Sequence, residues 1–455
     1  MEDRSLLQEE QTRLLHRWLA KDDLPQFRET FLSMHIYDQA QFYQSITAED
    51  RKKLYNYLSP KELADMFDVI EEEDERLPEY LGEMRPSYAA DMLSAMYADN
   101  AVDLLDQLPK SQMAMYLSLM DNDSARAAKE LLHYEDSTAG AIMTTEYVSI
   151  LANQTIRSAM NELKNQADVA ETIYYTYVVD DDNRLVGVIS LRDLILSDEE
   201  EMIAQKMNHR VHSVSVGMDQ EDVAKTIRDY DFLAVPVVDY DNHLLGIVTV
   251  DDIIDVIDEE ATEDYSGLAA VNVETIAANP VQASLKRLPW LITLLFLGMS
   301  TATMISHYEA LVSEASILAV FISLITGTAG NAGTQSLAVA VRRLAIKEDS
   351  NSFFKTFFGE LVTGLVTGLV TGGTIFLIVG LWKQNFILGF VIGTAMFFAI
   401  TVANLAGSLI PILMEKLGFD PAVASGPFIT TLSDLTSVLI YFNIASLFMS
   451  HFIGT

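Results

Sequence analysis

Hydrophobic residues follow three different patterns along the chain, and each pattern predicts a different architecture. Up to about residue 135, Leu, Met, Ala and Tyr recur at the spacing of amphipathic helices, in short segments of about a dozen residues. Start signals such as "LSPKELADMF" and "DNDSARAAKELL" separate these segments, because Ser and Asp side chains cap the first turn of a helix. We therefore expect an acidic α-helical N domain over residues 1–135, with its Met-rich faces packed in the core.

After residue 135 the pattern changes to short strands alternating with helices. "TIYYTYVVDDDNRLVGVISLRDLI" and "FLAVPVVDYDNHLLGIVTVDDII" share one order: an apolar strand, an acidic turn, a second apolar strand and a helix start. A short strand and a helix precede each stretch, so the chain contains two β-α-β-β-α copies about 60 residues apart. We assign residues 136–199 and 200–256 to these two α/β domains. An acidic connecting helix over residues 250–280 then leads to the last part of the chain.

Residues 281–455 contain five apolar stretches near the ~20 residues that cross a bilayer. Arg342, Arg343 and Lys355 lie in one predicted loop, whereas "HYEALVSE" and "WKQN" on the other side contain a single lysine. The positive-inside rule therefore places the N-terminal half in the cytoplasm and the C-terminus outside, in a multi-pass plasma-membrane protein. The predicted spans are residues 288–306, 315–341, 361–382, 386–414 and 426–448.

The net charge of −35 is confined to residues 1–280, since residues 281–455 hold eight acidic and eight basic side chains. Such a surface disfavours nucleic acid as a partner and attracts cations. The chain has no cysteine, which excludes disulfides and thiolate metal sites, and its histidines show no metal-ligand spacing. It also has no nucleophile–base pair, phosphate-binding loop or dinucleotide fingerprint. We therefore expect neither an enzyme nor an ATP-driven pump.

An aspartate, Asp434, lies near the middle of the last predicted span, "FITTLSDLTSVLIYF". A charge at that depth costs about 2.5–3.5 kcal/mol on insertion scales, so an intramembrane acid indicates an ion path. Asn331, Gln335 and Asn404 add oxygen atoms in two other spans, where interhelical hydrogen bonding is the alternative to pore lining. A glycine stripe in the third span predicts helix packing rather than an ion path: Gly364, Gly368 and Gly372.

The connecting helix carries eight acidic residues within positions 251–264. Like charges at this density destabilise a helix unless they are solvated or neutralised by a ligand. Carboxylates without Cys or His favour hard cations such as Mg²⁺ or Ca²⁺. The run therefore predicts a regulatory divalent-cation site, with a solvated acidic face as the alternative. Further acids precede it in the second α/β copy: Asp219, Glu221 and Asp231.

The two α/β copies are identified as tandem CBS (cystathionine-β-synthase) domains. The resemblance rests on a repeated run, Gly187-Val-Ile-Ser190-Leu-Arg-Asp193 and Gly246-Ile-Val-Thr249-Val-Asp-Asp252. In that family the run places a hydroxyl and a carboxylate beside an adenosine nucleotide, which implies a site for ATP. The alternative is that both runs only cap the helix that follows the strand. The candidate nucleotide contacts are Ser190, Asp193, Thr249 and Asp252.

The whole chain resembles the MgtE family of magnesium transporters and channels. The order of domains matches, as do "GTAGNAGTQSL", "PFITTLSDLTSVLIYF" and "EKLGFDPA". The resemblance implies a homodimer in the lipid bilayer whose pore lies between the protomers, with Asp434 of each chain on the pore axis and Asp420 facing the connecting helix. The carboxylates that sense cytosolic ions in this family correspond to Asp219, Glu221, Asp231, Asp252, Asp255, Glu260, Glu263 and Asp264, with Asp99 and Gly140 at the boundary with the N domain.

These observations predict a Mg²⁺ channel that runs down the electrochemical gradient into the cytoplasm. Mg²⁺ holds its waters tightly, so two Asp434 carboxylates would accept hydrogen bonds from a hydrated ion. At high cytosolic Mg²⁺, ions would bridge the acidic domains and the connecting helices would hold the pore shut. The alternatives are a channel for Mn²⁺, Co²⁺ or Ca²⁺, and a membrane-anchored nucleotide sensor without transport.

Overall fold

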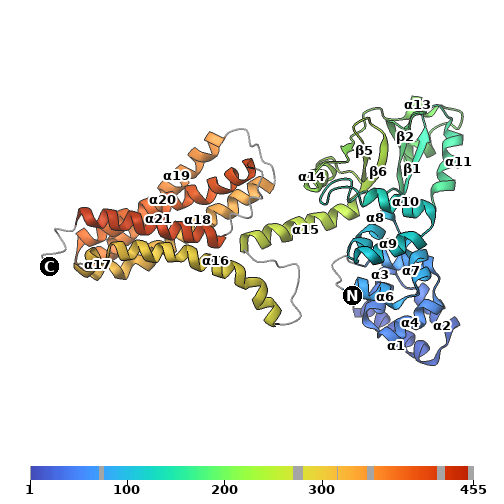
Figure 1. The fold of residues 1–455 in the computed structure, drawn as a ribbon. Coiled ribbons are helices and arrows are strands. Elements are labelled where there is room, and N and C mark those ends of the chain that lie inside the picture. The colour runs from blue at the N-terminus through green and yellow to red at the C-terminus, as the bar shows by residue number, and fades with distance from the viewer. Residues whose placement is uncertain are drawn as a thin grey trace. The chain divides into compact units, whose positions relative to one another are not determined.

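The computed structural model describes residues 2–70, 76–269, 280–314, 316–345, 353–417 and 426–448. The chain divides into two compact units, Met1–Asp258 and Glu259–Thr455, and each is described by itself. Figure 1 shows the helices and strands of both units. The predicted fold class is confirmed: a helical N domain, two CBS-type α/β domains, a connecting helix and five helices long and apolar enough to cross a membrane.

Short helices build the N domain, as the apolar spacing predicts. Ser59 forms a capping box with Glu62 at the start of α5, and the Asp121 side chain accepts hydrogen bonds from two backbone amides at the start of α10. Both predicted start signals are therefore confirmed. The described helices are α1 (Glu2–Lys21), α2 (Leu24–Leu32), α3 (Ile36–Ser45), α4 (Ala48–Tyr57), α5 (Pro60–Phe67), α6 (Leu77–Glu83), α7 (Pro86–Leu93), α8 (Ala98–Asp106), α9 (Lys110–Leu119) and α10 (Asn122–Leu131).

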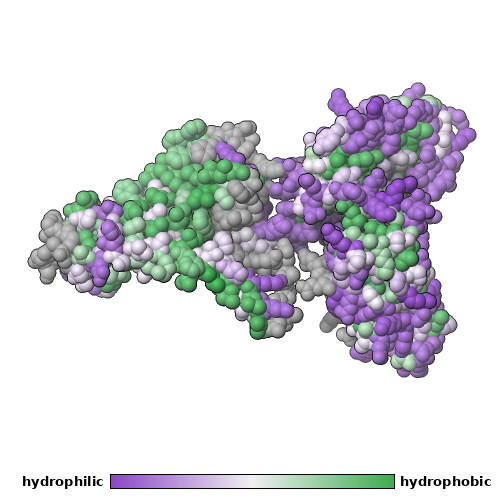
Figure 2. Space-filling view, in the orientation of Figure 1, coloured by the Kyte–Doolittle hydropathy of each residue, from purple (hydrophilic) through white to green (hydrophobic). Residues whose placement is uncertain are grey.

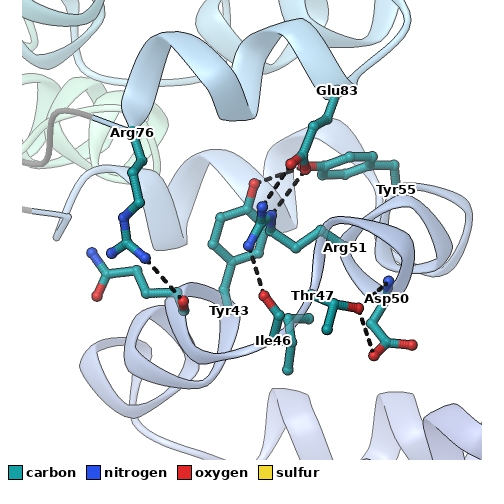
Figure 3. Close-up of polar contacts among 9 residues, drawn as sticks. Tyr43, Ile46, Thr47, Asp50, Arg51, Tyr55, Arg76 and Glu83 are labelled. Atoms are coloured by element: carbon teal, nitrogen blue, oxygen red, sulfur yellow. Dashed lines mark hydrogen bonds and ion pairs between the residues drawn. The ribbon is translucent and has the colours of Figure 1, made fainter.

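A buried ion pair ties α4 to α6 inside the N domain (Figure 3). Two guanidinium nitrogens of Arg51 lie 2.6 and 2.9 Å from the two carboxylate oxygens of Glu83, and a third donates to the Ile46 carbonyl. The Tyr55 hydroxyl donates to the same carboxylate, and Tyr43 and Tyr55 share a 2.7 Å hydrogen bond. Both charges are thus paired and hydrogen-bonded inside one domain, as buried charges require.

Each CBS domain contains the predicted order of strands and helices, arranged around a three-stranded sheet. In both sheets the first two strands are parallel and the last two antiparallel. The first domain contains β1 (Tyr147–Leu151), α11 (Ile156–Gln166), β2 (Thr172–Val179), β3 (Leu185–Ser190) and α12 (Leu191–Leu196). The second contains α13 (Ile203–Lys206), β4 (Val214–Ser215), α14 (Gln220–Tyr230), β5 (Ala234–Val238) and β6 (Leu244–Thr249).

The segment between the N domain and β1 pairs with the second CBS domain. Thr144 and Ile247 exchange two backbone hydrogen bonds of 2.8 and 3.0 Å, so this segment lies along β6. Gly246 permits this approach, because a Cβ at that position would lie 2.5 Å from the Thr144 carbonyl oxygen. The start of the first CBS domain is therefore joined to the second CBS domain by backbone hydrogen bonds as well as by chain connectivity.

The connecting helix, α15 (Val250–Ala269), contacts a different core at each end. At its start, Ile253 and Val256 are buried in the core of the first unit. At its end, Leu268 packs against a small cluster made by Leu337, Val341 and Ile429. Residues 270–279 of the predicted helix lie outside the described residues.

In the second unit (Figure 1), α18, α19 and α21 pack against α20, which is the most buried of the five long apolar helices, and α16 packs against α21. Hydrophobic side chains cover much of the surface of this unit (Figure 2), as a bilayer requires. The described elements are α16 (Pro280–His307), α17 (Glu309–Glu314), η1 (Ser316–Phe321), α18 (Ile322–Ala345), α19 (Phe353–Trp382), α20 (Phe386–Lys416) and α21 (Gly426–Leu447).

Glycines allow α19 and α20 to approach closely. A Cβ at Gly368 would lie 2.7 Å from the Phe397 carbonyl oxygen, and one at Gly372 would lie 2.5 Å from the Gly393 carbonyl oxygen. The prediction that the glycine stripe serves helix packing is therefore confirmed.

Candidate cation and nucleotide sites

Three carboxylates from three parts of the first unit meet at one point. Asp99 belongs to the first turn of α8, Glu171 directly precedes β2, and Asp252 belongs to the first turn of α15. Each offers one oxygen atom, and these atoms all lie within 4.8 Å of one another. The fold thus brings the N domain, the first CBS domain and the connecting helix to one acidic cluster. The family resemblance indicated Asp99 and Asp252 as separate candidates, whereas Glu171 was not predicted.

The cluster is buried at Asp99 and half-buried at Glu171 and Asp252, and no positive side chain pairs with it in the described part of the chain. Asp99 is only 6% exposed, and the Glu171 Oε2 atom is buried and accepts no hydrogen bond from a described residue. Burial, with the negative charges of Asp252 and Glu171, raises the pKa of Asp99 well above its usual value. Burial raises the pKa of Glu171 to about 8 and that of Asp252 to about 6. None of the ion pairs among the described residues includes these three carboxylates.

A divalent cation is the ligand that this arrangement fits best. Ionised carboxylates held this closely in a protein interior repel one another, and a cation between them would remove that repulsion. The donor set contains only oxygen atoms, which suits Mg²⁺ or Ca²⁺ better than metals that prefer sulfur or imidazole.

The other predicted cation ligands of the second CBS domain do not form one cluster. Asp219 caps the start of α14 and accepts from the Glu221 amide at 3.0 Å, whereas Asp231 follows the far end of this 11-residue helix in a left-handed conformation. Gly140 lies near the chain that leads into Asp219, because the Gly140 amide donates a hydrogen bond to the Val216 carbonyl. A Cβ on Gly140 would lie 2.6 Å from the Tyr134 ring, so the position excludes a side chain without a shift.

The remaining acidic candidates lie along α15. Asp255 and Glu263 are exposed, while Glu260 and Asp264 are half-buried. Among the described residues, none of these four joins a group of three metal-ligating side chains. Asp420 lies outside the described residues.

The two nucleotide motifs have different surroundings. In the first, the Ser190 hydroxyl caps α12 and donates to the Asp193 carboxylate at 2.6 Å, in an exposed position. In the second, the Thr249 hydroxyl donates to Asp252 at 2.5 Å, but Thr249 is 2% exposed and Asp252 belongs to the acidic cluster. The first motif is open to a ligand, whereas the second is enclosed.

One histidine does lie in a metal-ligand arrangement, contrary to the expectation from spacing. Asp239, Asp241 and His243 approach one another in the turn between β5 and β6, where the His243 ring nitrogen lies 2.8 Å from the Asp239 carboxylate. The matching turn of the first CBS domain has the same backbone hydrogen bonds to Asp180, with Arg184 in the place of the histidine. We therefore assign this arrangement to turn stability.

In the second unit, Asp434 is half-buried on α21 and faces α18. A Cβ on Gly330 of α18 would lie 3.9 Å from its Oδ1 atom and 3.0 Å from the Thr430 methyl group. One turn further along α18, the hydroxyls of Thr334 and Thr430 lie 3.3 Å apart. Among the described residues, no ion pair includes Asp434.

The three predicted pore amides are placed differently. Asn331 and Gln335 are exposed on α18, next in sequence to the residues that face Asp434. Asn404 is 4% exposed, and a Cβ on Gly364 would lie 3.3 Å from its own Cβ. The position of Asn404 therefore favours the alternative of interhelical packing, and Asn331 and Gln335 keep the pore-lining interpretation.

Comparison with known proteins links these features to one family. Residues 34–137 match the MgtE intracellular N domain, residues 139–200 and 201–259 match CBS domains, and residues 322–444 match the family described as divalent cation transporter. The chain is 72% identical to the magnesium transporter MgtE of Enterococcus faecalis over 98% of both chains. It is 38% identical to that of Bacillus subtilis over 93% of this chain and 94% of the relative, and 35% identical to that of Thermus thermophilus over 96% and 98%.

Two crystal structures match the cytosolic part. One is the soluble part of a magnesium transporter, 70% identical, with a TM-score of 0.55 over 56% of this chain and 99% of that chain. The other is the cytosolic domain of the Mg²⁺ channel MgtE in complex with ATP, 34% identical, with a TM-score of 0.51 over 54% and 99%.

The fold and the sites define a membrane transporter with a cytosolic CBS-containing half, not an enzyme. The chain contains five candidate spans, and it aligns with these relatives over almost its whole length. The chain belongs to the MgtE family of magnesium transporters, and the resemblance inferred from its motifs is confirmed.

Proposed function

We propose that the chain forms a Mg²⁺-selective channel in the plasma membrane, with its C-terminus outside, and that Mg²⁺ enters the cytoplasm through it down the electrochemical gradient. The observation that carries the proposal is Asp434, an intramembrane carboxylate without an ion-pair partner among the described residues. The names of the relatives, which describe magnesium transporters and a Mg²⁺ channel, support the choice of ion.

The pore lies between two copies of the chain. Asn331 and Gln335 are exposed in a single chain although they belong to a membrane span. Exposed amides at that depth would be costly against lipid, so they favour a water-filled passage at a subunit interface. Asp434 and the Thr334–Thr430 hydroxyl pair belong to the same helices, α18 and α21.

Asp434 binds the ion with its water shell in place. Mg²⁺ gives up water reluctantly and usually keeps several waters when one or two carboxylates bind it. Two Asp434 side chains balance its double charge, while hydroxyl and amide oxygens accept hydrogen bonds from the outer face of the hydration shell. Selectivity then depends on recognising a hydrated octahedron.

The acidic cluster acts as the regulatory cation site. Mg²⁺ between Asp99, Glu171 and Asp252 favours the arrangement in which the N domain, the first CBS domain and the start of α15 are held together. The end of the same helix packs against α18 and α21 through Leu268. High cytosolic Mg²⁺ therefore stabilises a compact cytosolic half and holds the pore closed, with Asp219, Glu221, Asp231, Asp255, Glu260, Glu263, Asp264 and Asp420 as further candidate ligands.

ATP binds at the first CBS motif. Ser190 and Asp193 are accessible, whereas Thr249 is enclosed and Asp252 belongs to the cation cluster. Asp193→Ala should weaken ATP binding by about tenfold or more, the equivalent of one lost charge-assisted hydrogen bond. Thr249→Val should leave it within about twofold, as measured by calorimetry. Equal losses in both variants would show that the second motif contributes as much as the first, and unchanged binding in both would place the nucleotide elsewhere.

The decisive experiment measures Mg²⁺ flux into vesicles that contain the purified protein. Asp434→Ala should abolish flux while the protein still folds and dimerises, and Asn404→Ala at a packed position serves as the matched membrane control for folding. Normal Mg²⁺ uptake by Asp434→Ala would refute the proposed role. Competition with Mn²⁺, Co²⁺ and Ca²⁺ tests the alternative of a broader cation channel, and absence of flux in the wild type would favour a sensor without transport.

A further inference from the structure

The N-cap residue of helix α8 supplies no side-chain cap, and within the first turn the Asp99 carboxylate accepts from the Asn100 amide at 2.9 Å. The N-cap residue is Tyr97, whose side chain caps no backbone amide. The first amides of a helix have no partner within the helix, and buried amides without a partner are costly. Two carboxylates from distant parts of the chain supply the missing acceptors: Asp68 accepts from the Tyr97 amide and Glu146 from the Ala98 amide, each at 3.3 Å.

These two acceptors differ in the domain that provides them. Asp68 follows α5 and belongs to the N domain, and it also accepts from the Asn100 side chain at 3.3 Å. The contacts between Asp68 and α8 lie within the N domain, so they do not depend on whether the N domain is docked on the CBS domains. Glu146 belongs to the first CBS domain, so its hydrogen bond to Ala98 crosses from one domain to the other.

Glu146 is held in place by the CBS side of this contact. Its Oε2 atom accepts from the Thr144 hydroxyl at 2.8 Å and from the Thr145 amide at 3.1 Å. Thr144 pairs with Ile247 of β6 through its backbone, and the Glu146 carbonyl accepts from the Glu171 amide at 2.9 Å. The carboxylate that caps α8 is therefore fixed to both CBS domains and to the residue that supplies one acid of the cluster.

We propose that Glu146 is a positioning residue for cation sensing: it docks the N domain on the CBS pair by capping α8, and so holds Asp99 within reach of Glu171 and Asp252. The proposal rests on the proposed regulatory function of that cluster. A negative group at a helix N-terminus is favourable, so the cap stabilises the docked position of α8. The Glu146 charge also adds to the repulsion that Asp99 meets from Glu171 and Asp252. Mg²⁺ offsets this repulsion, and docking and ion binding therefore favour each other.

The test uses hydrogen exchange of the full-length protein in detergent at increasing Mg²⁺. The readout is protection of the amides in residues 94–104, which include the start of α8. Glu146→Ala should raise the Mg²⁺ concentration for half-protection about tenfold, as expected for a lost hydrogen bond to a charged group. Glu146→Gln keeps an acceptor oxygen without the charge and should raise it only about two- to threefold. Glu201→Ala, which removes a half-buried glutamate that pairs with Lys206 away from α8, is the control and should leave this concentration unchanged.

Exchange in the region of Arg51 shows whether the N domain itself stays folded, because a purely structural defect would lower protection there as well. If Glu146→Ala lowers protection near Arg51, the proposal is tested by comparing Glu146→Gln with the wild type only. If both Glu146 variants reach half-protection at the same Mg²⁺ concentration as the wild type, the proposal is overturned, while the proposed regulatory cluster is unaffected. If the wild type itself shows no Mg²⁺-dependent protection at residues 94–104, the proposed regulation fails instead.

Discussion

Glu83 and Asp99 are both acidic side chains of the N domain that are largely removed from solvent. They differ in their neighbours, because Glu83 has a positive partner and Asp99 has further acids beside it. Glu83 lies 2.6 Å from Arg51 and also accepts from Tyr55, so its charge is balanced within one domain (Figure 3). Asp99 lies within 4.8 Å of two further acids and forms no ion pair among the described residues. The first arrangement is neutralised by a side chain of the same domain, whereas the second is the one for which we propose a cation as the neutralising partner.

On the proposed function, the comparison separates a buried charge that serves folding from buried charges that serve cation binding. An ion pair that is neutral by itself contributes the same amount to the stability of the folded state at all Mg²⁺ concentrations. A group of like charges makes the folded state less stable on its own and more stable with a ligand, so its effect depends on the ligand concentration. Stability measured with and without Mg²⁺ should therefore distinguish the two regions.

The largest effect is expected at the neutralised pair. Arg51→Met leaves Glu83 buried without its partner, and breaking a buried pair in this way costs about 3–5 kcal/mol. The loss should be the same with and without Mg²⁺, as measured by hydrogen exchange in α4 and α6. Arg126→Met removes an exposed pair with Asp123 and should change stability by less than about 0.5 kcal/mol. A Mg²⁺-dependent loss in Arg51→Met would abolish the distinction between the two regions.

The next effect is expected at the acidic cluster. Asp99→Asn removes one of three like charges, so without Mg²⁺ the first unit should become more stable than the wild type. With Mg²⁺ at about 100 times its dissociation constant, the wild type gains about 2.7 kcal/mol and the variant should lose most of that gain. Thermal unfolding at several Mg²⁺ concentrations measures both changes. Glu130→Gln, at an exposed position of the N domain, is the matched control, and a variant that responds to Mg²⁺ like the wild type would argue against the cation site.

A smaller, pH-dependent effect is expected at Asp68, which has hydrogen-bond donors but no positive partner among the described residues. Burial raises its pKa to about 7, although hydrogen bonds from Asn100 and Tyr97 act in the opposite direction. Because the folded protein holds this proton more tightly than the unfolded chain, the stabilisation is complete at low pH and is lost as the pH rises from about 4 to 7.

Asp68→Asn should therefore flatten the stability of the N domain over that pH range, by on the order of 1 kcal/mol per pH unit at most. Chemical unfolding at pH 4, 5, 6, 7 and 8 measures it. Near pH 4 the variant and the wild type should be similar, and near pH 8 the variant should be the more stable. An unchanged pH dependence would show that Asp68 keeps an ordinary pKa.

Several features of this chain could be predicted from local patterns. Ser59 and Asp121 start helices because their side chains reach amides only a few residues away. The membrane helices could be recognised because apolar composition over about 20 residues is sufficient to span a bilayer. Asp434 could be identified as a candidate because a charge in such a segment is costly wherever the neighbouring helices lie.

Other features depend on contacts between distant segments. Glu171 is an isolated acid before a strand, and nothing in its neighbourhood along the chain marks it as a ligand. Ser190 and Thr249 occupy equivalent positions in two copies of one motif, yet only Thr249 is enclosed. Asn404 resembles Asn331 in sequence context, but it packs against α19.

Sequence alone therefore determined the domain order, the helices, the repeated α/β units and the spans, because these follow from interactions between residues close together in the chain. Tertiary structure decided which acids share a site and which of two similar motifs stays open. It also showed that Glu146 caps a helix of another domain. The physical reason is that charge repulsion, burial and capping act over a few ångströms in space, and only folding sets those distances between residues such as Asp99, Glu171 and Asp252, which lie far apart in the chain.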